Sequence, residues 1–187
     1  MEIMADNIIT PEFRGAFVSV FKASGMKGQP ESAKKFSVRA VFMPNADLAT
    51  MKAQAQAAAQ EKWGSNVPKT LRSPFRRNEE LDNPVIGVPG DAIVMTFSAN
   101  EDRRPGVVDA NLQDIIDEAE CYSGAWYRAQ VRAFAYEQSG NKGVSFGLQN
   151  LQKLRDGEPL GGRIPASKAF DAVPSEGGSK TAGGMFD

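Results

Sequence analysis

One stretch of the sequence limits the fold more than any other: AWYRAQVRAFAY, from Ala125 to Tyr136. At the two-residue period of a β-strand, one face carries mostly small apolar residues and the other carries rings and guanidinium groups. The first face is Ala125, Tyr127, Ala129, Val131, Ala133 and Ala135, and the second is Trp126, Arg128, Gln130, Arg132, Phe134 and Tyr136. A strand with one apolar face of limited volume fits the interior of a small β-barrel.

Further alternating segments supply the other strands of such a barrel. They predict strands over residues 14–22, 35–43 and 91–99, and the alternating residues from Val144 to Leu148 predict a hairpin with the 125–136 strand, joined by a long tip. An alanine- and glutamine-rich segment over residues 47–63 predicts one helix, with Asp47 as its N-cap and Gly64 as its stop. Residues 65–90 contain four prolines and predict an irregular excursion over the surface.

About five strands, one sizeable helix and long loops favour a small barrel over alternating βαβ units. We therefore expect a mainly β protein with an OB-fold five-stranded barrel in residues 1–170. Residues 171–187 are dominated by glycine, serine and alanine and predict a flexible C-terminal tail.

The composition excludes several classes of function. The 187 residues include no histidine and one cysteine, so a Ser-His-Asp triad, a Cys-His pair and a conventional zinc site are excluded. No apolar run approaches a membrane span and no export signal begins the chain, and the lone Cys121 suits a reducing cytosol. Because the net charge is -1, attraction to a nucleic acid must come from the distribution of charge.

The outer face of the 125–136 strand has the chemistry of a single-stranded nucleic-acid site. Bases stack on rings, and phosphates pair with guanidinium groups such as those of Arg128 and Arg132, which lie about 13 Å apart along a strand. Rings covered by a loop and arginines exposed only to water would give the same pattern. The alternation alone leaves both interpretations open.

The C-terminal half carries a more specific signal. It contains Tyr122-x-Gly124, the Tyr/Arg/Val strand ending in Ala135-Tyr136, Gly147-Leu148-x-Asn150, and QKLRDGEPLGG over residues 152–162. With ITPEFRGAF and PFRRNEE in the N-terminal half, this pattern resembles a family of phage-encoded single-stranded DNA-binding proteins built on an OB-fold. The resemblance covers most of residues 10–165 and implies non-sequence-specific binding of single-stranded DNA in phage replication, recombination or repair.

The candidate DNA-binding residues combine rings with cations. Lys34 and Lys35 border a loop that commonly contacts ligands in OB-folds, and Lys153 and Arg155 precede a turn at Asp156-Gly157. The full set is Trp126, Arg128, Arg132, Phe134, Tyr136, Arg39, Lys34, Lys35, Arg76, Lys153 and Arg155. No cofactor, metal site or enzymatic activity is expected.

The end of the chain predicts a second kind of contact. Phage and bacterial proteins of this function commonly end in a strongly acidic tail that recruits replication partners, whereas here the few carboxylates are offset by Lys180. Phe186 and Asp187 still place a ring beside an acid, so we expect replication or recombination proteins to bind there. Self-association stays open as a further partner class. The resemblance implies a location in the cytoplasm of the infected bacterial host.

Two other functions stay open at this point. One is an OB-fold module for RNA or a protein partner. The other is a magnesium-dependent nuclease that would use the acidic segment Asp109, Asp114, Asp117, Glu118 and Glu120. A solvated acidic surface explains the same residues more simply.

Overall fold

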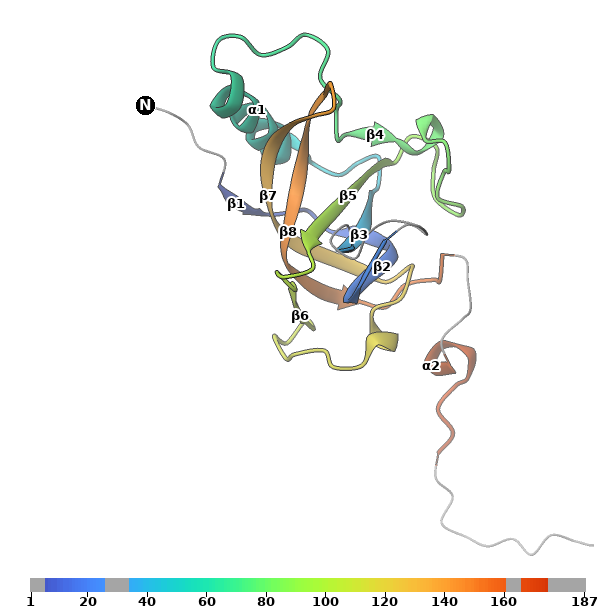
Figure 1. The fold of residues 1–187 in the computed structure, drawn as a ribbon. Helices are drawn as coiled ribbons and strands as arrows, with labels where there is room; N and C mark the ends of the chain where they lie inside the picture. The colour runs from blue at the N-terminus through green and yellow to red at the C-terminus, as the bar shows by residue number, and fades with distance from the viewer. Residues whose placement is uncertain (1–5, 26–33, 161–165, 175–187) are drawn as a thin grey trace, which may run out of the picture.

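The computed structural model describes residues 6–25, 34–160 and 166–174 (Figure 1). Its strands are β1 (Asn7–Ile9), β2 (Phe13–Ser24), β3 (Lys35–Phe42), β4 (Arg76–Arg77), β5 (Ile93–Asn100), β6 (Gly106–Val108), β7 (Trp126–Gln138) and β8 (Asn141–Arg155). Its helices are α1 (Ala49–Trp63) and α2 (Ala166–Ala169), with single 3-10 turns η2 (Asn78–Glu80) and η3 (Glu118–Glu120). No helix in the described part of the chain is long and apolar enough to cross a membrane.

Five of the strands close into a ring. β2 pairs with β3, β3 with β5, β5 with β8, β8 with β7, and β7 again with β2. All of these pairings are antiparallel except β5 with β8, which is parallel. This confirms the predicted five-stranded OB-type barrel, and β1, β4 and β6 are short additions that the sequence patterns did not predict.

The ring is uneven. β7 and β8 pair along their whole length, whereas β2 meets β7 only at Phe13 and Arg14, and β5 meets β8 only at Phe97 and Ser98. The β7–β8 hairpin therefore continues beyond the barrel as an arm that rises beside α1 (Figure 1).

The tip of this arm differs from the prediction of a long connection. Ser139 and Gly140 both have left-handed backbones, with φ of 50° and 80°, so the chain reverses in two residues. Such a turn matches the twist of the strands it joins. Pairing consequently runs up to Gln138 and Asn141 on either side.

Large rings fill the barrel. Phe13 lies edge-on to Phe42 and Phe97 at centroid distances of 5.5 and 5.7 Å, and Phe97 contacts Phe146 at 6.2 Å. Tyr127 of β7 stacks on Phe13 at 6.1 Å, and the smaller Ala129, Val131 and Ala133 farther along that strand leave room for the rings in a barrel interior of little volume. Each of the five barrel strands therefore contributes a ring to the core, and β7 adds small residues beyond Tyr127.

Helix α1 packs on the arm and confirms the predicted helix. Its buried residues are mainly alanines with Met51, and it contacts β7 and β8. The helix begins at Ala49, whose N–H donates to the Asp47 carboxylate at 3.0 Å, so Asp47 caps from one residue before the N-cap position. It ends at Gly64, which has φ of 57° and donates its N–H to Gln60.

The 65–90 excursion lies over the barrel, as predicted. Val85 forms a second apolar cluster with Ala92 and with Val41 and Val94, which face outward from β3 and β5. This end of the outer surface of β2, β3 and β5 is therefore covered by protein. Of the predicted tail, residues 171–174 are exposed and form neither helix nor strand, and Phe186 and Asp187 lie outside the described residues.

Candidate nucleic-acid interface

The side chains of β7 divide between interior and exterior as the alternation predicted. Tyr127, Ala129, Val131 and Ala133 are at most 3% exposed, together with Ala125 just before the strand. On the opposite face Arg128, Arg132 and Phe134 are exposed, and Trp126 and Tyr136 are half-buried. The outward rings and cations differ in whether other protein groups already contact them.

At the first end of β7, protein groups already occupy the ring of Trp126. The guanidinium groups of Arg155 and Arg14 lie over it, at 4.6 and 5.8 Å from its centroid. Arg155 also forms two hydrogen bonds to the carboxylate of Glu12, at 2.8 and 2.9 Å. Its hydrogen bonds lower the pKa of Glu12 and raise that of Arg155. Trp126 and Arg155 thus belong to a clamp that ties the end of β8 to the start of β2.

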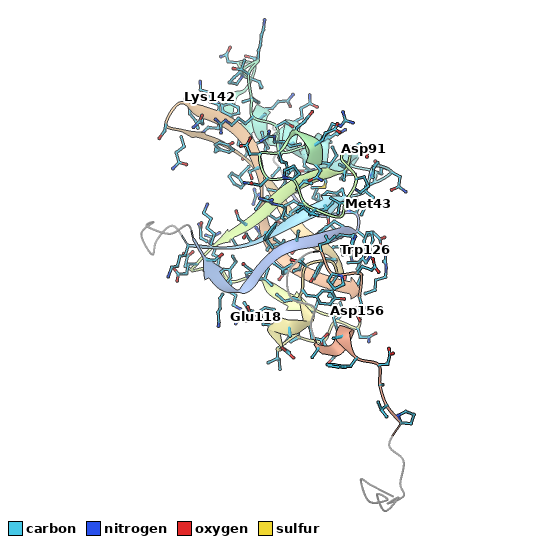
Figure 2. The ribbon with its side chains drawn as sticks, turned by 90° about the vertical axis from the view of Figure 1, so that its right-hand side faces the viewer. Met43, Asp91, Glu118, Trp126, Lys142 and Asp156 are labelled. Carbon is cyan, nitrogen blue, oxygen red and sulfur yellow. The ribbon has the colours of Figure 1, made fainter. Side chains whose placement is uncertain are left out.

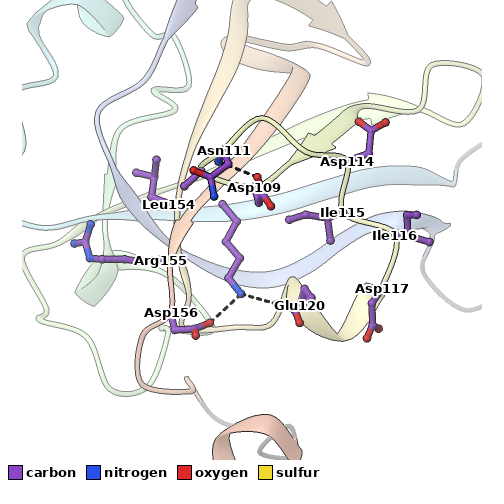
Figure 3. Close-up of a pocket in the computed structure, with 12 residues that line it drawn as sticks. Asp109, Asn111, Asp114, Ile115, Ile116, Asp117, Glu120, Leu154, Arg155 and Asp156 are labelled. Atoms are coloured by element: carbon purple, nitrogen blue, oxygen red, sulfur yellow. Dashed lines mark hydrogen bonds and ion pairs between the residues drawn. The ribbon is translucent and has the colours of Figure 1, made fainter.

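The predicted acidic segment lines a hollow of about 390 Å³, which we call the acidic hollow (Figure 3). Its carboxylates include Asp109, Asp114, Asp117 and Glu120. In the described residues, no three histidine, cysteine or carboxylate side chains gather in an arrangement that could hold a metal ion. The geometry therefore gives the nuclease alternative no support.

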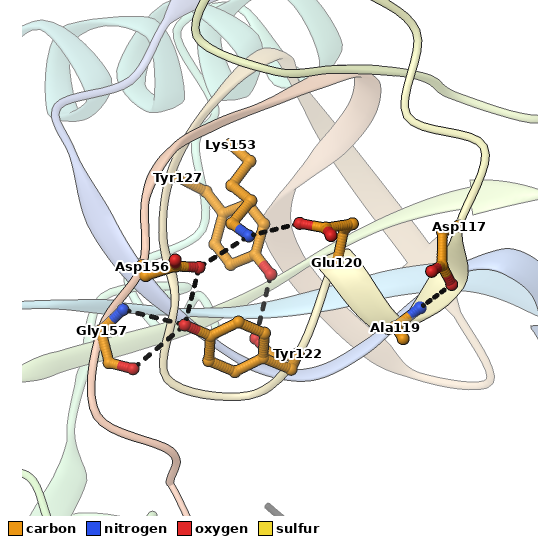
Figure 4. A network of polar contacts seen from close by, with 8 residues as sticks. All are labelled: Asp117, Ala119, Glu120, Tyr122, Tyr127, Lys153, Asp156 and Gly157. Carbon is orange, nitrogen blue, oxygen red and sulfur yellow. Dashed lines mark hydrogen bonds and ion pairs between the residues drawn. The ribbon is translucent and has the colours of Figure 1, made fainter. Parts of the chain in front are cut away.

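Lys153 borders this hollow but points its ammonium group inward. The residue is 8% exposed, and Nζ lies 2.9 Å from Asp156 and 3.3 Å from Glu120 (Figure 4). Burial works to lower the pKa of Lys153, but its hydrogen bonds to the two carboxylates outweigh burial and raise that pKa. The ammonium also lies 5.1 Å from the ring of Tyr122, whose hydroxyl contacts Gly157. Lys153 therefore holds the 156–157 turn.

A different hollow joins cations to an exposed ring. It measures about 430 Å³ and lies over the short β5–β8 pairing, where it is lined by residues 98–100 and 147–149. Lys35, Arg103 and Arg104 supply three exposed cations, and Phe134, which is 44% exposed, reaches it from β7. We call this the basic hollow, and none of the described residues that line it is acidic.

Phe134 also lines a hollow on the other side of β7. That hollow, about 450 Å³, contains Arg132 and the α1 residues Glu61 and Lys62. Tyr136 lies next along the arm, with its ring centroid 6.5 Å from that of Phe134. Arg132, Phe134 and Tyr136 therefore form a ridge with a hollow on each side, and cations in both.

Two further cation–ring pairs lie on β2 and its neighbours, and one of them includes Arg104 of the basic hollow. Arg39 on β3 lies over the ring of Phe17 at 5.1 Å, and Arg104 lies over Phe21 at 5.5 Å. Phe17 is 67% exposed and has φ of 48°, because β2 is irregular between Ala16 and Ser19. Figure 2 shows the face on which β2, β3 and β5 run side by side.

The sequence patterns missed Phe17, Phe21, Arg103 and Arg104. The Arg103-Arg104 pair is visible in the loop after the 91–99 strand, but Glu101 and Asp102 directly before it mask the basic character of that loop in the sequence. No comparable signal marked Phe17, because strict alternation gives no indication of the β2 irregularity that exposes its ring.

The remaining predicted residues lie apart. Arg128 is exposed, and its Nε donates to Gln152 at 2.6 Å. Arg76 on β4 donates to the backbone carbonyl of Glu80 at 3.0 Å. Lys34 is half-buried and directly precedes Lys35. The structure thus brings Lys35, Arg132, Phe134 and Tyr136 together, with Lys34 next to Lys35, and places the other predicted residues elsewhere.

The chain matches a known protein family over most of its length. Residues 6–179 match the family model described as the single-stranded DNA-binding protein of Enterobacter phage Enc34. The chain belongs to this family. The resemblance predicted from the sequence motifs is therefore confirmed.

A curated relative of this Enc34-type chain also comes from a phage. Protein p50 of Acyrthosiphon pisum secondary endosymbiont phage 1 is 29% identical over 181 residues, which span 91% of this chain and 93% of the relative. The two proteins therefore correspond over nearly their whole lengths.

Solved structures agree with the fold. The Enc34 single-stranded DNA-binding protein matches with a TM-score of 0.66 at 19% identity, covering 88% of this chain and 90% of that one. Its complex with single-stranded DNA matches with a TM-score of 0.68 at 18% identity, covering 83% and 89%. The gp2.5 single-stranded DNA-binding protein of bacteriophage T7 matches with a TM-score of 0.57 at 12% identity, covering 91% and 100%. These matches establish that the Enc34-type fold is shared, and none of these proteins is described as an enzyme.

Proposed function

We propose that this protein binds single-stranded DNA without sequence preference and that the basic hollow is the centre of its binding surface. The observation that carries the proposal is the meeting of Lys35, Arg103 and Arg104 with the exposed ring of Phe134 in one hollow. Cations beside a stacking ring hold both parts of a nucleotide, the phosphate and the base, and neither contact reads the identity of the base.

The DNA path follows from the neighbours of Phe134. From the basic hollow, a strand can cross the ridge of Phe134 and Tyr136 and reach Arg132 and Lys62 on the far side of β7. Each base that stacks contributes about 1–3 kcal/mol, so two rings and a few phosphates are enough for micromolar binding.

A second arm of the path runs along β3. Arg39 and Phe17 lie beyond Lys35 on the same strand pair, and the apolar cluster around Val41 ends the exposed surface there. We propose Lys34, Arg76 and Arg128 as phosphate contacts outside the hollow. Trp126, Lys153 and Arg155 are assigned to intramolecular support, because guanidinium groups cover the ring of Trp126 and carboxylates neutralise both cations, whereas Arg76 and Arg128 bond only to uncharged groups within the described residues.

The biological setting is that of the family. We propose that the protein coats single strands during phage DNA replication, recombination or repair in the cytoplasm of the infected bacterial host. Phe186 and Asp187 are proposed as the contact for replication or recombination proteins. Deleting residues 171–187 should then abolish binding of those proteins and leave the affinity for DNA intact or raised.

The binding surface is tested by fluorescence anisotropy with a labelled oligo(dT) at several salt concentrations. Arg103→Ala and Arg104→Ala should each weaken binding and reduce the slope of log K against log salt by about 0.7. Phe134→Ala should weaken binding with little change in the salt slope. The matched controls are Arg77→Ala on β4 and Phe170→Ala after α2, which remove an exposed arginine and an exposed ring elsewhere.

Two results would contradict the proposal. One is unchanged affinity in folded Arg103→Ala, Arg104→Ala and Phe134→Ala proteins. The other is equal loss in the control variants. Competition by a matched RNA oligonucleotide, measured in the same assay, separates a preference for DNA from general single-strand binding.

A further inference from the structure

The loop between β6 and η3 presents two apolar side chains to water. Leu112 is 70% exposed and Ile116 is 90% exposed, and Ile116 also lines the acidic hollow (Figure 3). Neither belongs to the barrel core or packs against it. Two large apolar side chains exposed four residues apart on one loop are candidates for a surface where another molecule binds.

Hydrogen bonds within the loop hold Leu112 in an unfavourable left-handed backbone conformation. The Asp109 carboxylate accepts hydrogen bonds from the backbone N–H groups of Asn111 and Gln113, at 2.8 and 3.0 Å. Ile115 donates its N–H to Val107 at 3.0 Å, which fixes the returning chain against β6. Leu112 has φ of 64°, a left-handed conformation that costs a branched residue about 1–2 kcal/mol and glycine almost nothing. An exposed leucine at this position is therefore costly for folding.

The surroundings of these side chains are acidic. From Pro105 to Tyr127 the sequence has five carboxylates and no lysine or arginine. The nearest cations that border the acidic hollow are Lys153 and Arg155, and both already pair with carboxylates. The surface around Leu112 and Ile116 is therefore negatively charged, and a DNA strand would be repelled from it.

We propose that Leu112, Ile116 and the flanking carboxylates form a docking surface for a partner protein, which binds through an amphipathic segment rich in lysine or arginine. The apolar side of such a segment covers Leu112 and Ile116, and its cations meet Asp114, Asp117 and Glu120. Charge complementarity selects this occupant over a nucleic acid or an anionic membrane. Among the described residues, the acidic hollow shares no lining residue with the basic hollow, so the partner is expected to bind while DNA occupies the basic hollow. Arg128, whose partner Gln152 donates to the carbonyls of Asp109 and Ala110, is the proposed phosphate contact beside the docking surface.

The test uses a synthetic amphipathic peptide of lysine and leucine, with a scrambled peptide of the same composition as its control. Amide chemical shifts of the full-length labelled protein are followed during the titration, with and without saturating oligo(dT). We expect shifts in residues 109–120 and 153–156 for the amphipathic peptide only, and the same affinity in both conditions. The double variant Leu112→Gly with Ile116→Ser should bind the peptide about tenfold more weakly.

One variant is chosen to preserve the fold, and another serves as a control for the loss of an exposed apolar side chain. Leu112→Gly relieves the left-handed strain, so the fold is retained, and Ile86→Ser removes an isoleucine that is 86% exposed on a different loop. Peptide binding that survives the double variant, or that Ile86→Ser weakens equally, overturns the proposal. Sedimentation supplies a second check. If the parent protein and the Ile86→Ser variant are dimers but the double variant is a monomer, the surface binds a second copy of this chain, and the proposal is overturned. Oligo(dT) affinity should be unchanged in every variant, so this test fails or succeeds independently of the DNA-binding surface.

Discussion

The ring of Tyr136 lies so closely against Gly143, its cross-strand partner, that a β-carbon at residue 143 would come within 2.6 Å of the Tyr136 hydroxyl oxygen. On its other side the same β-carbon would meet the backbone carbonyl of Arg72 at 2.9 Å. Glycine at residue 143 therefore lets the arm carry a ring on its outer face while the 65–90 excursion passes close by.

Gly143→Ala should destabilise the protein by about 1–3 kcal/mol, because both the ring and the Arg72 backbone must move. The measurement is the free energy of unfolding from urea denaturation. Gly147→Ala on the same strand is the matched control, since its nearest heavy atoms lie at 3.7 Å or beyond. Equal losses for the two substitutions would show that the close approach at residue 143 has no energetic consequence.

Trp126→Ala and Phe134→Ala should have opposite effects. Trp126 is held between protein groups, so its loss should cost about 1–3 kcal/mol of stability and leave oligo(dT) affinity unchanged. Phe134 is 44% exposed, so its loss should cost little stability and about 1–3 kcal/mol of binding free energy. Urea denaturation and fluorescence anisotropy measure the two quantities. If a folded Trp126→Ala protein loses as much oligo(dT) affinity as Phe134→Ala, Trp126 also contacts the DNA.

The alternation in the sequence predicted the two faces of β7 because a strand in a barrel must bury one face. Val131 and Ala133 had to lie inside, and Arg132 and Phe134 therefore had to lie outside. The same period could not tell which outward rings stay free. That depends on contacts such as Arg155 with Glu12, which are 143 residues apart in the chain and leave no local pattern.

The short strands β1 and β6 could not be predicted from the sequence for a related reason. β1 and β6 have three residues each, too few for a period to appear, and they form because β7 and β8 offer free edges. The basic hollow likewise depends on the parallel pairing of β5 with β8, which brings Arg103 and Lys35 close to Phe134. Tertiary pairing of distant segments, and not local propensity, builds this part of the site.

Phe17→Gly should weaken oligo(dT) binding without loss of stability. The left-handed backbone at Phe17 suits glycine, so the substitution relieves strain while it removes an exposed ring. We expect a loss of about 1–3 kcal/mol of binding free energy if one base stacks there. Leu112→Gly is the control, because it makes the same backbone change outside the DNA surface. Unchanged affinity in Phe17→Gly would confine the DNA path to the basic hollow and the arm.

Lys153→Met should lower the free energy of unfolding by about 1–3 kcal/mol, because Asp156 and Glu120 lose the ammonium that neutralises them. The salt dependence of oligo(dT) binding should stay the same, since the ammonium faces inward. Lys35→Met is the matched control and should show the reverse: little change in stability and a salt slope reduced by about 0.7. A reduced salt slope in Lys153→Met would mean that this lysine reaches the DNA backbone.

The stability of the protein should decline at alkaline pH. Burial raises the pKa of the Cys121 thiol from 9.0 to about 11 and also raises the pKa of Tyr127, while carboxylate partners raise that of Lys153. In the unfolded chain these groups release their protons at lower pH. The stability they contribute is therefore complete below about pH 9 and falls as the pH rises towards about 11. Urea midpoints measured across this range should decrease.

Cys121→Ala isolates the contribution of the thiol. The variant should start from a lower stability, because a buried group is removed, but its decline between about pH 9 and pH 11 should be shallower than in the parent protein. A thiol reagent gives an independent reading: at about pH 8 the folded protein should react slowly and the urea-unfolded protein quickly, since the thiolate is the reacting form. Identical declines in the two proteins, or a fast reaction in the folded state, would show that Cys121 titrates as a solvent-exposed thiol does.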